Sequence, residues 1–357
     1  MNIKLNNITK ALAKFDRVIQ QKSSLPVLQC LLIETIGNNQ VQFTGSDLET
    51  EIQITVPAEV KEAGKTCIQF KTLKAFAALN TDFSIKTLSS DKARLKGASQ
   101  STVNTLPAEN FPECRTVSDE DLTLPPGFLT HLDDVLVCAS KDPVEPRYYL
   151  RGVLFDFQPG QLTLSASNGH QLATTTLKIT HTDNKKIILP VVACESIIKN
   201  FADSESLLQI AFNDHHLKIS IPGNQLISKL IDASYPDFSK VFELDRPNHY
   251  QIEAEHLKNA IKAAEITINT QIRGMRFKVE AGQLSVQSAN AQAEESEITL
   301  PVQSSSDFEY ALNSSYMFNI LGKLTDSLTA NTDAALGNTI FKSINTDTTY
   351  LIMHMKI

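Results

Sequence analysis

Three short clusters hold side chains with catalytic or ligating chemistry, and each lacks partners that such chemistry needs. Gly64-Lys65-Thr66 resembles the end of a phosphate-binding loop, but Glu59 stands where that loop requires its first glycine. His215-His216 could bind a metal ion, yet no cysteine or carboxylate cluster accompanies the pair. Asn168-Gly169-His170 offers a histidine without a serine or cysteine nucleophile motif. We therefore predict a protein that is not an enzyme and that has no metal site and no cofactor.

Basic side chains gather instead on segments with helical periodicity. On a helix with about 100° per residue, Lys10, Lys14 and Arg17 share one face, opposite an apolar stripe. Further helical segments add lysines at Lys71, Lys74, Lys199, Lys258 and Lys262. Such a layer could contact a phosphate backbone without reading its sequence, although an ordinary solvated helix face is the alternative.

Composition limits how nucleic acid could be bound. The 357 residues include 33 basic and 40 acidic side chains, giving a formal charge of −7, so the surface as a whole cannot coat nucleic acid. Tryptophan is absent, which disfavours a base-stacking platform.

The start of the chain has no apolar signal region, no apolar run is long enough for a membrane span, and the five cysteines are widely spaced. We expect a cytoplasmic protein with reduced thiols and no membrane partner.

Two strand-like motifs occur three times at even spacing along the chain. The first, alternating polar and apolar residues, occupies 40–47, 161–168 and 283–290. The second occupies 28–33, 150–155 and 272–277. Helical patterns start each copy, near residues 8–19, 129–136 and 257–264, and recur in mid-copy at 72–80, 191–201 and 314–324. The pattern predicts three tandem α+β domains, at residues 1–119, 120–246 and 247–357.

Longer segments, correctly ordered across all three copies, carry a family resemblance. The chain resembles the bacterial DNA sliding clamp, the beta subunit of DNA polymerase III, in these segments: Leu25-Pro26-Val27-Leu28, Thr44-Gly45-Ser46-Asp47-Leu48-Glu49, Thr105-Leu106-Pro107-Ala108-Glu109-Asn110-Phe111-Pro112, Arg147-Tyr148-Tyr149-Leu150, Asn168-Gly169-His170-Gln171-Leu172, Ser228-Lys229-Leu230-Ile231-Asp232, Tyr235-Pro236-Asp237-Phe238, Ile272-Arg273-Gly274-Met275-Arg276 and 350–357.

This resemblance implies three clamp domains per chain and a homodimeric ring of two chains. Helices would line a hole that holds double-stranded DNA, and antiparallel sheets would form the outer rim. The implied function is that of a non-catalytic processivity factor, which tethers the polymerase to its template. The implied partners are the DNA polymerase III alpha subunit, the clamp-loader delta subunit and other proteins with clamp-binding motifs.

The resemblance also implies a cleft for short apolar peptides between the second and third domains. Its residues, carried over position by position, are Leu150, Ser167, Gly169, His170, Gln171, Leu172, Pro236, Lys240, Val241, Leu351, Met353, Met355, Lys356 and Ile357. Leucine, valine and methionine side chains suit an adaptable apolar socket. Gln171 stands where the family usually has arginine, and His354 where it usually has proline. These differences predict weaker binding of standard motif peptides.

Other positions correspond to the family's DNA contacts and ring interface. Lys22 matches a basic loop residue, and Tyr148 and Tyr149 match an aromatic pair that can touch the DNA backbone. Ile266 fits an apolar position of the ring interface, whereas Ser101 stands where a large apolar residue is common. A weaker interface leaves an alternative function open, that of a monomeric peptide-binding adaptor or decoy of the same fold. The mass in solution distinguishes the two, because a monomer cannot encircle DNA.

Overall fold

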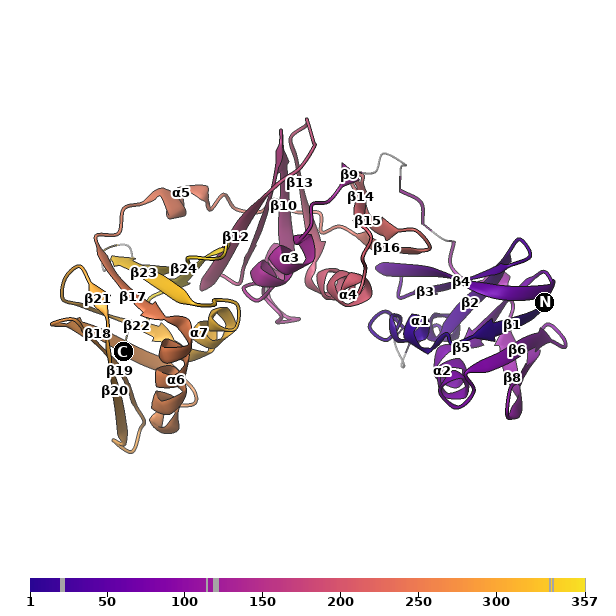
Figure 1. Ribbon diagram of the computed structural model, residues 1–357, viewed down its shortest axis with the longest axis horizontal. Helices are drawn as coiled ribbons and strands as arrows, with labels where there is room; N and C mark the ends of the chain where they lie inside the picture. The colour runs from indigo at the N-terminus through magenta and orange to yellow at the C-terminus, as the bar shows by residue number, and fades with distance from the viewer. Residues whose placement is uncertain (20–22, 114, 118–121, 334, 336, 357) are drawn as a thin grey trace. The chain divides into compact units, whose positions relative to one another are not determined.

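The computed structural model describes residues 1–19, 23–113, 115–117, 122–333, 335 and 337–356. The chain forms two compact units (Figure 1). The first unit combines Met1–Pro126 with Val192–Leu230, and the second combines Gly127–Val191 with Ile231–Ile357. The middle third of the sequence therefore contributes to both units.

One antiparallel sheet runs through the first unit, and the strand pairing β4–β16 joins the first third of the sequence to the middle third. Within this pairing Glu51 lies opposite Ile227. The described strands, in spatial order, are β1 (Asn2–Asn6), β6 (Asp82–Thr87), β7 (Lys92–Lys96), β8 (Gln100–Leu106), β5 (Lys65–Gln69), β2 (Cys30–Ile36), β3 (Gln40–Ser46), β4 (Thr50–Glu62), β16 (Asn224–Lys229), β15 (His216–Ile221), β14 (Gln209–Phe212) and β9 (Leu122–Thr123).

The helices of the first unit bury one side each. They are α1 (Thr9–Ala13), α2 (Phe70–Leu79), α4 (Val191–Phe201, in this unit from Val192 onward) and the 3₁₀ turns η1 (Pro26–Gln29) and η2 (Ala108–Asn110). Phe15 packs edge-on against Phe70, with ring centroids 6.4 Å apart. The apolar stripe predicted for residues 8–19 is buried, but the prediction of one continuous helix was wrong. The α-helix ends at Ala13 because the amides of Lys14 and Phe15 bond three residues back, which tightens the chain into turns.

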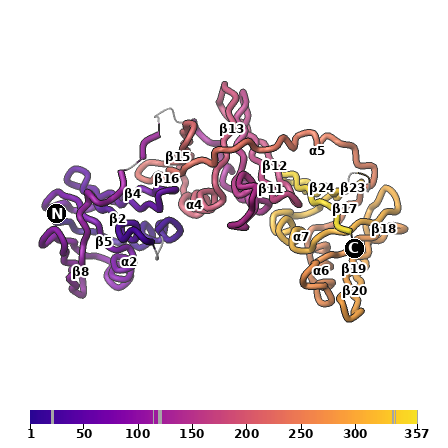
Figure 2. The backbone as a smooth tube through the Cα atoms, turned by 180° about the vertical axis from the view of Figure 1, so that it is seen from behind, coloured from indigo at the N-terminus to yellow at the C-terminus, as the bar shows by residue number. Residues whose placement is uncertain are grey.

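A second long sheet, of the second unit, joins the middle and last thirds of the sequence through the pairing β12–β25. Figure 2 labels β12 of the middle third close to β24 of the last third in this sheet. Its described strands are β13 (Lys185–Pro190), β10 (Gly152–Gln158), β11 (Gln161–Ser167), β12 (Gln171–Lys178), β25 (Thr349–Met353), β24 (Asn338–Ser343), β23 (Ser327–Asp333), β17 (Asn248–Glu253) and β21 (Gln303–Ser304). A smaller sheet contains β20 (Glu295–Pro301), β19 (Gln283–Ala289), β18 (Gly274–Glu280) and β22 (Phe308–Asn313). Buried Tyr250 and Tyr310 link the two sheets through their hydroxyls, 2.8 Å apart.

Helices lie along these sheets, and α3, α6 and α7 bury apolar residues. The helices are α3 (Phe128–Leu136), η3 (Tyr148–Arg151), α5 (Ser239–Glu243), α6 (Ala254–Ala264), η4 (Glu265–Thr267) and α7 (Ser314–Leu321). Helix α3 lies against β11 and β12, and α6 lies against β19 and β20. Asn313 caps α7 by accepting the Ser315 amide at 2.9 Å. No helix among the described residues is both long and apolar enough to cross a bilayer.

Most of the predicted pattern is confirmed. The first strand trio forms β3, β11 and β19, and helices combine with antiparallel sheets as expected of an α+β fold. For the second trio, the predicted starts of the strands were too early in the sequence. Residues 28–29 and 150–151 lie in η1 and η3, and Arg273 adopts a φ of 55° just before β18. Pro26 fixes a helical φ at the start of η1, which favours a turn there over a strand. The predicted domain boundaries remain predictions, and residues 118–121 lie outside the described part.

Candidate peptide-binding cleft and basic helical surface

The floor of the candidate cleft is an apolar cluster built on the β12–β25 pairing. Leu172 and Leu351 lie directly opposite each other on these strands, and both are buried with Ile340 of β24. Phe238, Val241 and Phe242 pack against this cluster from the α5 segment. The structure thus brings together Leu172, Val241 and Leu351, as predicted, and adds three residues that the sequence had not indicated.

A tight turn at 167–171 forms one side of the cleft. The Asn168 side chain accepts the amides of His170 and Gln171, each at 3.0 Å. Gly169 has a φ of 89°, a backbone conformation that residues with a Cβ rarely adopt, so this position favours glycine. The buried Ser167 hydroxyl accepts the Gly169 amide at 3.0 Å. These bonds fix the loop that carries the exposed His170 imidazole.

Two polar residues of this turn have opposite orientations. His170 is exposed and stacks on Tyr316 of α7, with ring centroids 6.0 Å apart. Gln171 is only 2% exposed, and its amide nitrogen donates to the Val137 carbonyl at 3.0 Å. The Gln171 side chain therefore faces α3, from the position that the resemblance matched to an arginine, and its role in the cleft remains a prediction.

The last described residues lie beside this turn, on the same side of the cleft. Met353 of β25 is 40% exposed, and its amide donates to the His170 carbonyl at 2.8 Å. The Met355 amide donates to the Ala311 carbonyl at 2.8 Å, while Lys356 is exposed. The tail is thereby tied both to the turn and to β22. Ile357, also carried over from the family, lies outside the described residues.

His354 interrupts this exposed tail with a half-buried imidazole. Its Nε2 lies 3.1 Å from the Thr332 hydroxyl and 2.9 Å from the Thr339 hydroxyl. Its ring stacks on Tyr310, with centroids 5.3 Å apart. Burial lowers the pKa of His354, and the nearby Asp333 opposes this shift. The native tail therefore favours a neutral imidazole at this position.

The remaining predicted cleft residues differ in exposure. Pro236 and Lys240 are exposed on the α5 segment, and Leu150 is buried at the end of η3. Sequence reasoning missed Tyr235, whose hydroxyl accepts the Ser167 amide at 2.9 Å and whose burial raises its pKa. Tyr235 also packs edge-on against Tyr149, with ring centroids 5.8 Å apart. The quoted segment 235–238 contained the signal, but only Pro236 was carried over from it.

Exposed basic residues on the helices form a second candidate surface. Lys10 lies on α1, Lys71 on α2 and Lys262 on α6, and each is exposed. Within the described part of the chain, no ion pair of the structure includes any of these three. They are therefore the helical cations whose charge is most available to a polyanion.

The other predicted DNA contacts are more constrained. Acidic neighbours pair with several of them: Arg17 with Glu195 at 2.5 Å, Lys74 with Asp16 at 2.5 Å, Lys199 with Asp16 at 3.7 Å and Lys258 with Glu255 at 3.7 Å. Lys14 is half-buried, and burial lowers its pKa. Tyr148 is 53% exposed, whereas Tyr149 is half-buried against Tyr235. Lys22 lies outside the described residues.

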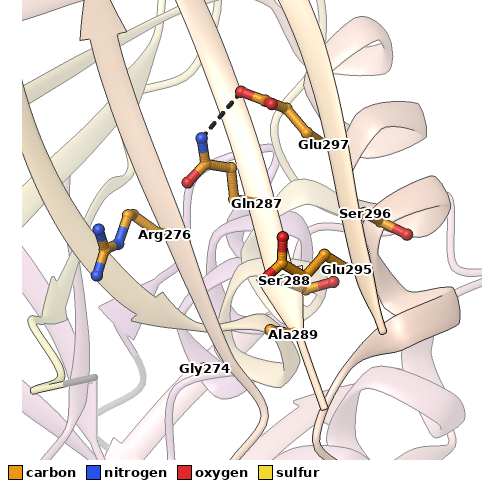
Figure 3. Close-up of a pocket in the computed structure, with 8 residues that line it drawn as sticks. All are labelled: Gly274, Arg276, Gln287, Ser288, Ala289, Glu295, Ser296 and Glu297. Atoms are coloured by element: carbon orange, nitrogen blue, oxygen red, sulfur yellow. Dashed lines mark hydrogen bonds between the residues drawn. The ribbon is translucent and has the colours of Figure 1, made fainter. Parts of the chain in front are cut away.

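Two sheet edges carry the candidate ring interface. Ile266 is 83% exposed on η4, and Ser101 is exposed on β8. Figure 3 shows the acidic end of the small sheet, where Glu295 and Glu297 project from the edge strand β20. The Glu297 carboxylate accepts the Gln287 amide at 2.9 Å, and this and the Ser285 hydroxyl lower its pKa. Both glutamates are exposed on this strand.

No group of three or more potential metal-binding side chains occurs among the residues that the structure describes. Among the described residues, Cys30, Cys67, Cys138 and Cys194 are buried and form no disulfide. Burial raises the pKa of Cys30 to about 11, so its thiol stays protonated at neutral pH.

Comparison with known proteins extends over almost the whole chain. Models of the DNA polymerase III beta subunit match in order, with the N-terminal domain at residues 1–115, the central domain at 128–237 and the C-terminal domain at 239–356. The beta sliding clamp of Pseudomonas putida is 28% identical over 95% of both chains, and that of Escherichia coli K12 is 24% identical over 99% of both.

Solved structures match equally broadly. A DNA polymerase sliding clamp from Pseudomonas aeruginosa, crystallised with a ligand, has a TM-score of 0.90 at 25% identity and covers 100% of both chains. The sliding clamp from Bacillus subtilis has a TM-score of 0.93 at 16% identity, covering 100% of this chain and 99% of that one. At that identity the second match supports the fold alone.

The buried imidazole predicts a pH dependence of stability. Because the folded protein lowers the pKa of His354, the unfolded chain binds the proton more readily once the pH falls below about 6.5. We expect the free energy of unfolding to decrease between pH 7.5 and pH 5.5, and to decrease less in His354→Gln. Urea denaturation at both pH values measures this difference. Equal decreases in the two proteins would contradict it, and His256→Gln, at an exposed histidine, provides the control.

Proposed function

Since the chain belongs to the DNA polymerase III beta-subunit family, we propose that it acts as a DNA sliding clamp, a non-catalytic ring that encircles duplex DNA and tethers a polymerase. The observation that carries this proposal is the order of the matches, because all three family domains follow one another across nearly the whole chain. The finer proposals concern how the ring closes, which residues face DNA and which partners bind. We also propose that the clamp acts in the cytoplasm, where the chromosome lies.

The ring closes head to tail through sheet edges of opposite charge. Residues 100–104 of β8 pair only with β7, since β5 meets β8 only at its far end, and β20 is an edge strand of the small sheet. Exposed Lys92, Arg94 and Lys96 of β7 lie beside the first edge, and Glu295 and Glu297 lie on the second. Two unpaired strand edges with complementary charge can pair between chains.

An apolar contact supports the same interface. A groove of about 380 Å³ lies beside β8, lined in part by Pro26, Val103 and Leu106. Ile266 is a large side chain left 83% exposed on η4. In a head-to-tail arrangement of first and third domains, Ile266 of one chain fits such a groove on the other. Because Ser101 is small and polar, this contact buries less apolar surface than it would with a large apolar residue at position 101.

Partner proteins bind the cleft in this proposal. The half-buried Phe238, Val241 and Phe242 on its apolar cluster, together with the exposed Met353, suit short segments with spaced leucine or phenylalanine residues. The partners of this kind are the polymerase alpha subunit, the clamp-loader delta subunit and other proteins with clamp-binding motifs. A monomeric adaptor would use the same cleft, so the oligomeric state separates the two functions.

Charge reversal at the acidic edge should open the ring. We expect wild type to sediment as a dimer at micromolar concentration, and Glu295→Lys/Glu297→Lys as mostly monomer, because lysines would then face Arg94 and Lys96 across the interface. Glu309→Lys, on β22 at the other edge of the same sheet, is the control and should remain dimeric. A wild-type protein found only as monomer would exclude encirclement and favour the adaptor.

Loss of the free helical cations should weaken retention on DNA. We expect Lys71→Glu/Lys262→Glu to leave circular DNA sooner than wild type after loading, with a smaller difference in high salt, because phosphate contacts are screened. Exposed lysines on strands, changed as Lys178→Glu/Lys342→Glu, give a control of equal charge. Gel filtration of the loaded complex measures the retention of each variant on DNA. Equal retention of the two double variants at low salt would show that the helical layer does not face DNA.

Truncation of the exposed methionine should weaken peptide binding. A buried leucine or phenylalanine contributes about 1.5–3 kcal/mol, so Met353→Ala should cost roughly tenfold in affinity. A fluorescent peptide with spaced leucine and phenylalanine residues, titrated by anisotropy, measures this loss. Ile344→Ala removes a side chain that is 70% exposed, away from the apolar cluster, and should leave affinity unchanged. Equal affinity of wild type and Met353→Ala would place the peptide elsewhere.

A further inference from the structure

A buried arginine lies behind the α5 side of the cleft, outside the residues that the family resemblance indicated. Arg246 is 7% exposed. Its Nη1 donates to the Leu244 carbonyl at 2.7 Å, and its Nη2 donates to the Val241 carbonyl at 2.8 Å. Its Nε and Nη2 both donate to Oδ1 of Asn338, at 3.0 and 2.8 Å. One planar guanidinium thus ties the end of α5 to the start of β24.

Helix α5 depends on tertiary contacts because it is short and exposed. It has five residues, and none of them is buried. The Asp237 carboxylate accepts the Ser239 amide at 3.0 Å, which fixes the start of the helix. Carbonyls at a helix end need partners, and helices of this length are marginal on their own. The Arg246 guanidinium supplies those partners at the end that carries Val241 into the cleft.

The same end of the β23–β24 hairpin also holds the tail. The His354 amide donates to the Gly337 carbonyl at 2.8 Å, next to Asn338. The Asp333 carboxylate, where β23 ends, attracts both the Arg246 guanidinium and a protonated His354. Both sides of the cleft, α5 and the tail, are therefore attached to one short connection between two strands.

We propose that Arg246 is a positioning residue for peptide binding. With Asn338 it fixes α5 so that Val241, Phe238 and Phe242 meet the Leu172 and Leu351 cluster in one arrangement. At 7% exposure its side chain offers almost no surface to a peptide, so it acts through the segment that it holds. Preorganising a binding surface in this way lowers the ordering cost of association. This inference rests on the proposed peptide-binding function of the cleft.

Substitutions at both ends of this contact test the proposal. The probe is the fluorescent peptide used for Met353, and the second measurement is hydrogen exchange of residues 239–244 in the free protein. Arg246→Ala should bind about tenfold more weakly, with faster exchange in this segment, because hydrogen bonds to a charged group are lost. Asn338→Ala should resemble it. Asn338→Asp keeps an acceptor for the guanidinium and should bind within about threefold of wild type.

A double variant distinguishes positioning from general stabilisation. If the two residues act as one contact, Arg246→Ala/Asn338→Ala should bind no more weakly than the worse single variant. Arg276→Ala, at an exposed arginine of β18, is the control and should change neither measurement. If Arg246→Ala does not fold, Arg246→Lys serves instead, since an ammonium keeps the charge but cannot bond three oxygens in a fork.

Two results would overturn the proposal. One is wild-type affinity and wild-type exchange of 239–244 in Arg246→Ala or Arg246→Lys. The other is an Asn338→Asp protein that loses as much affinity as Asn338→Ala. Failure of the proposed function gives another result, because the wild-type protein itself would then not bind the peptide. The exchange of α5 would in that case still show whether Arg246 fixes the segment.

Discussion

Two strand pairings place one third of the sequence in both compact units, and the candidate sites depend on them. The β4–β16 pairing extends the sheet of the first domain into the middle of the chain, and β12–β25 does the same for the third domain. Each pairing satisfies backbone groups that would otherwise form an exposed sheet edge. The cleft follows from the second pairing, because Leu172 and Leu351 become neighbours only when these strands align.

The sequence predicted the elements well because repetition and alternation are local signals. The strands β3, β11 and β19 coincide with the first repeated motif, and the apolar stripe from Ile8 to Ile19 is buried as its spacing indicated. The end of α1 at Ala13 could not be predicted, since no glycine or proline marks it. Its tightening arises from bonds three residues back, which depend on how Phe15 and Val18 reach the core.

The cleft could be predicted only in part, because its geometry depends on contacts distant in sequence. The resemblance supplied Leu172, Val241 and Met353, which the structure places at or beside the apolar cluster. It supplied no signal for Arg246, whose role depends on Asn338 far along the chain. On the helical layer, the predicted cations could be identified, but their pairing with acidic residues on neighbouring helices could not. Arg17 and Glu195, for example, are 178 positions apart.

The two departures from the usual family residues change the chemistry of the cleft in different ways. At position 354 a proline would fix φ but would have no amide to donate. His354 does donate, to the Gly337 carbonyl at 2.8 Å, and its ring adds two threonine hydroxyls as partners. The tail is therefore held by hydrogen bonds, and not by the fixed φ of a proline ring. At position 171 an amide that faces α3 replaces a cation, so the polar character at this end of the cleft comes from His170 and the backbone. For the proposed cleft, we therefore expect selectivity for partner segments to depend more on the shape of the apolar cluster than on paired charge.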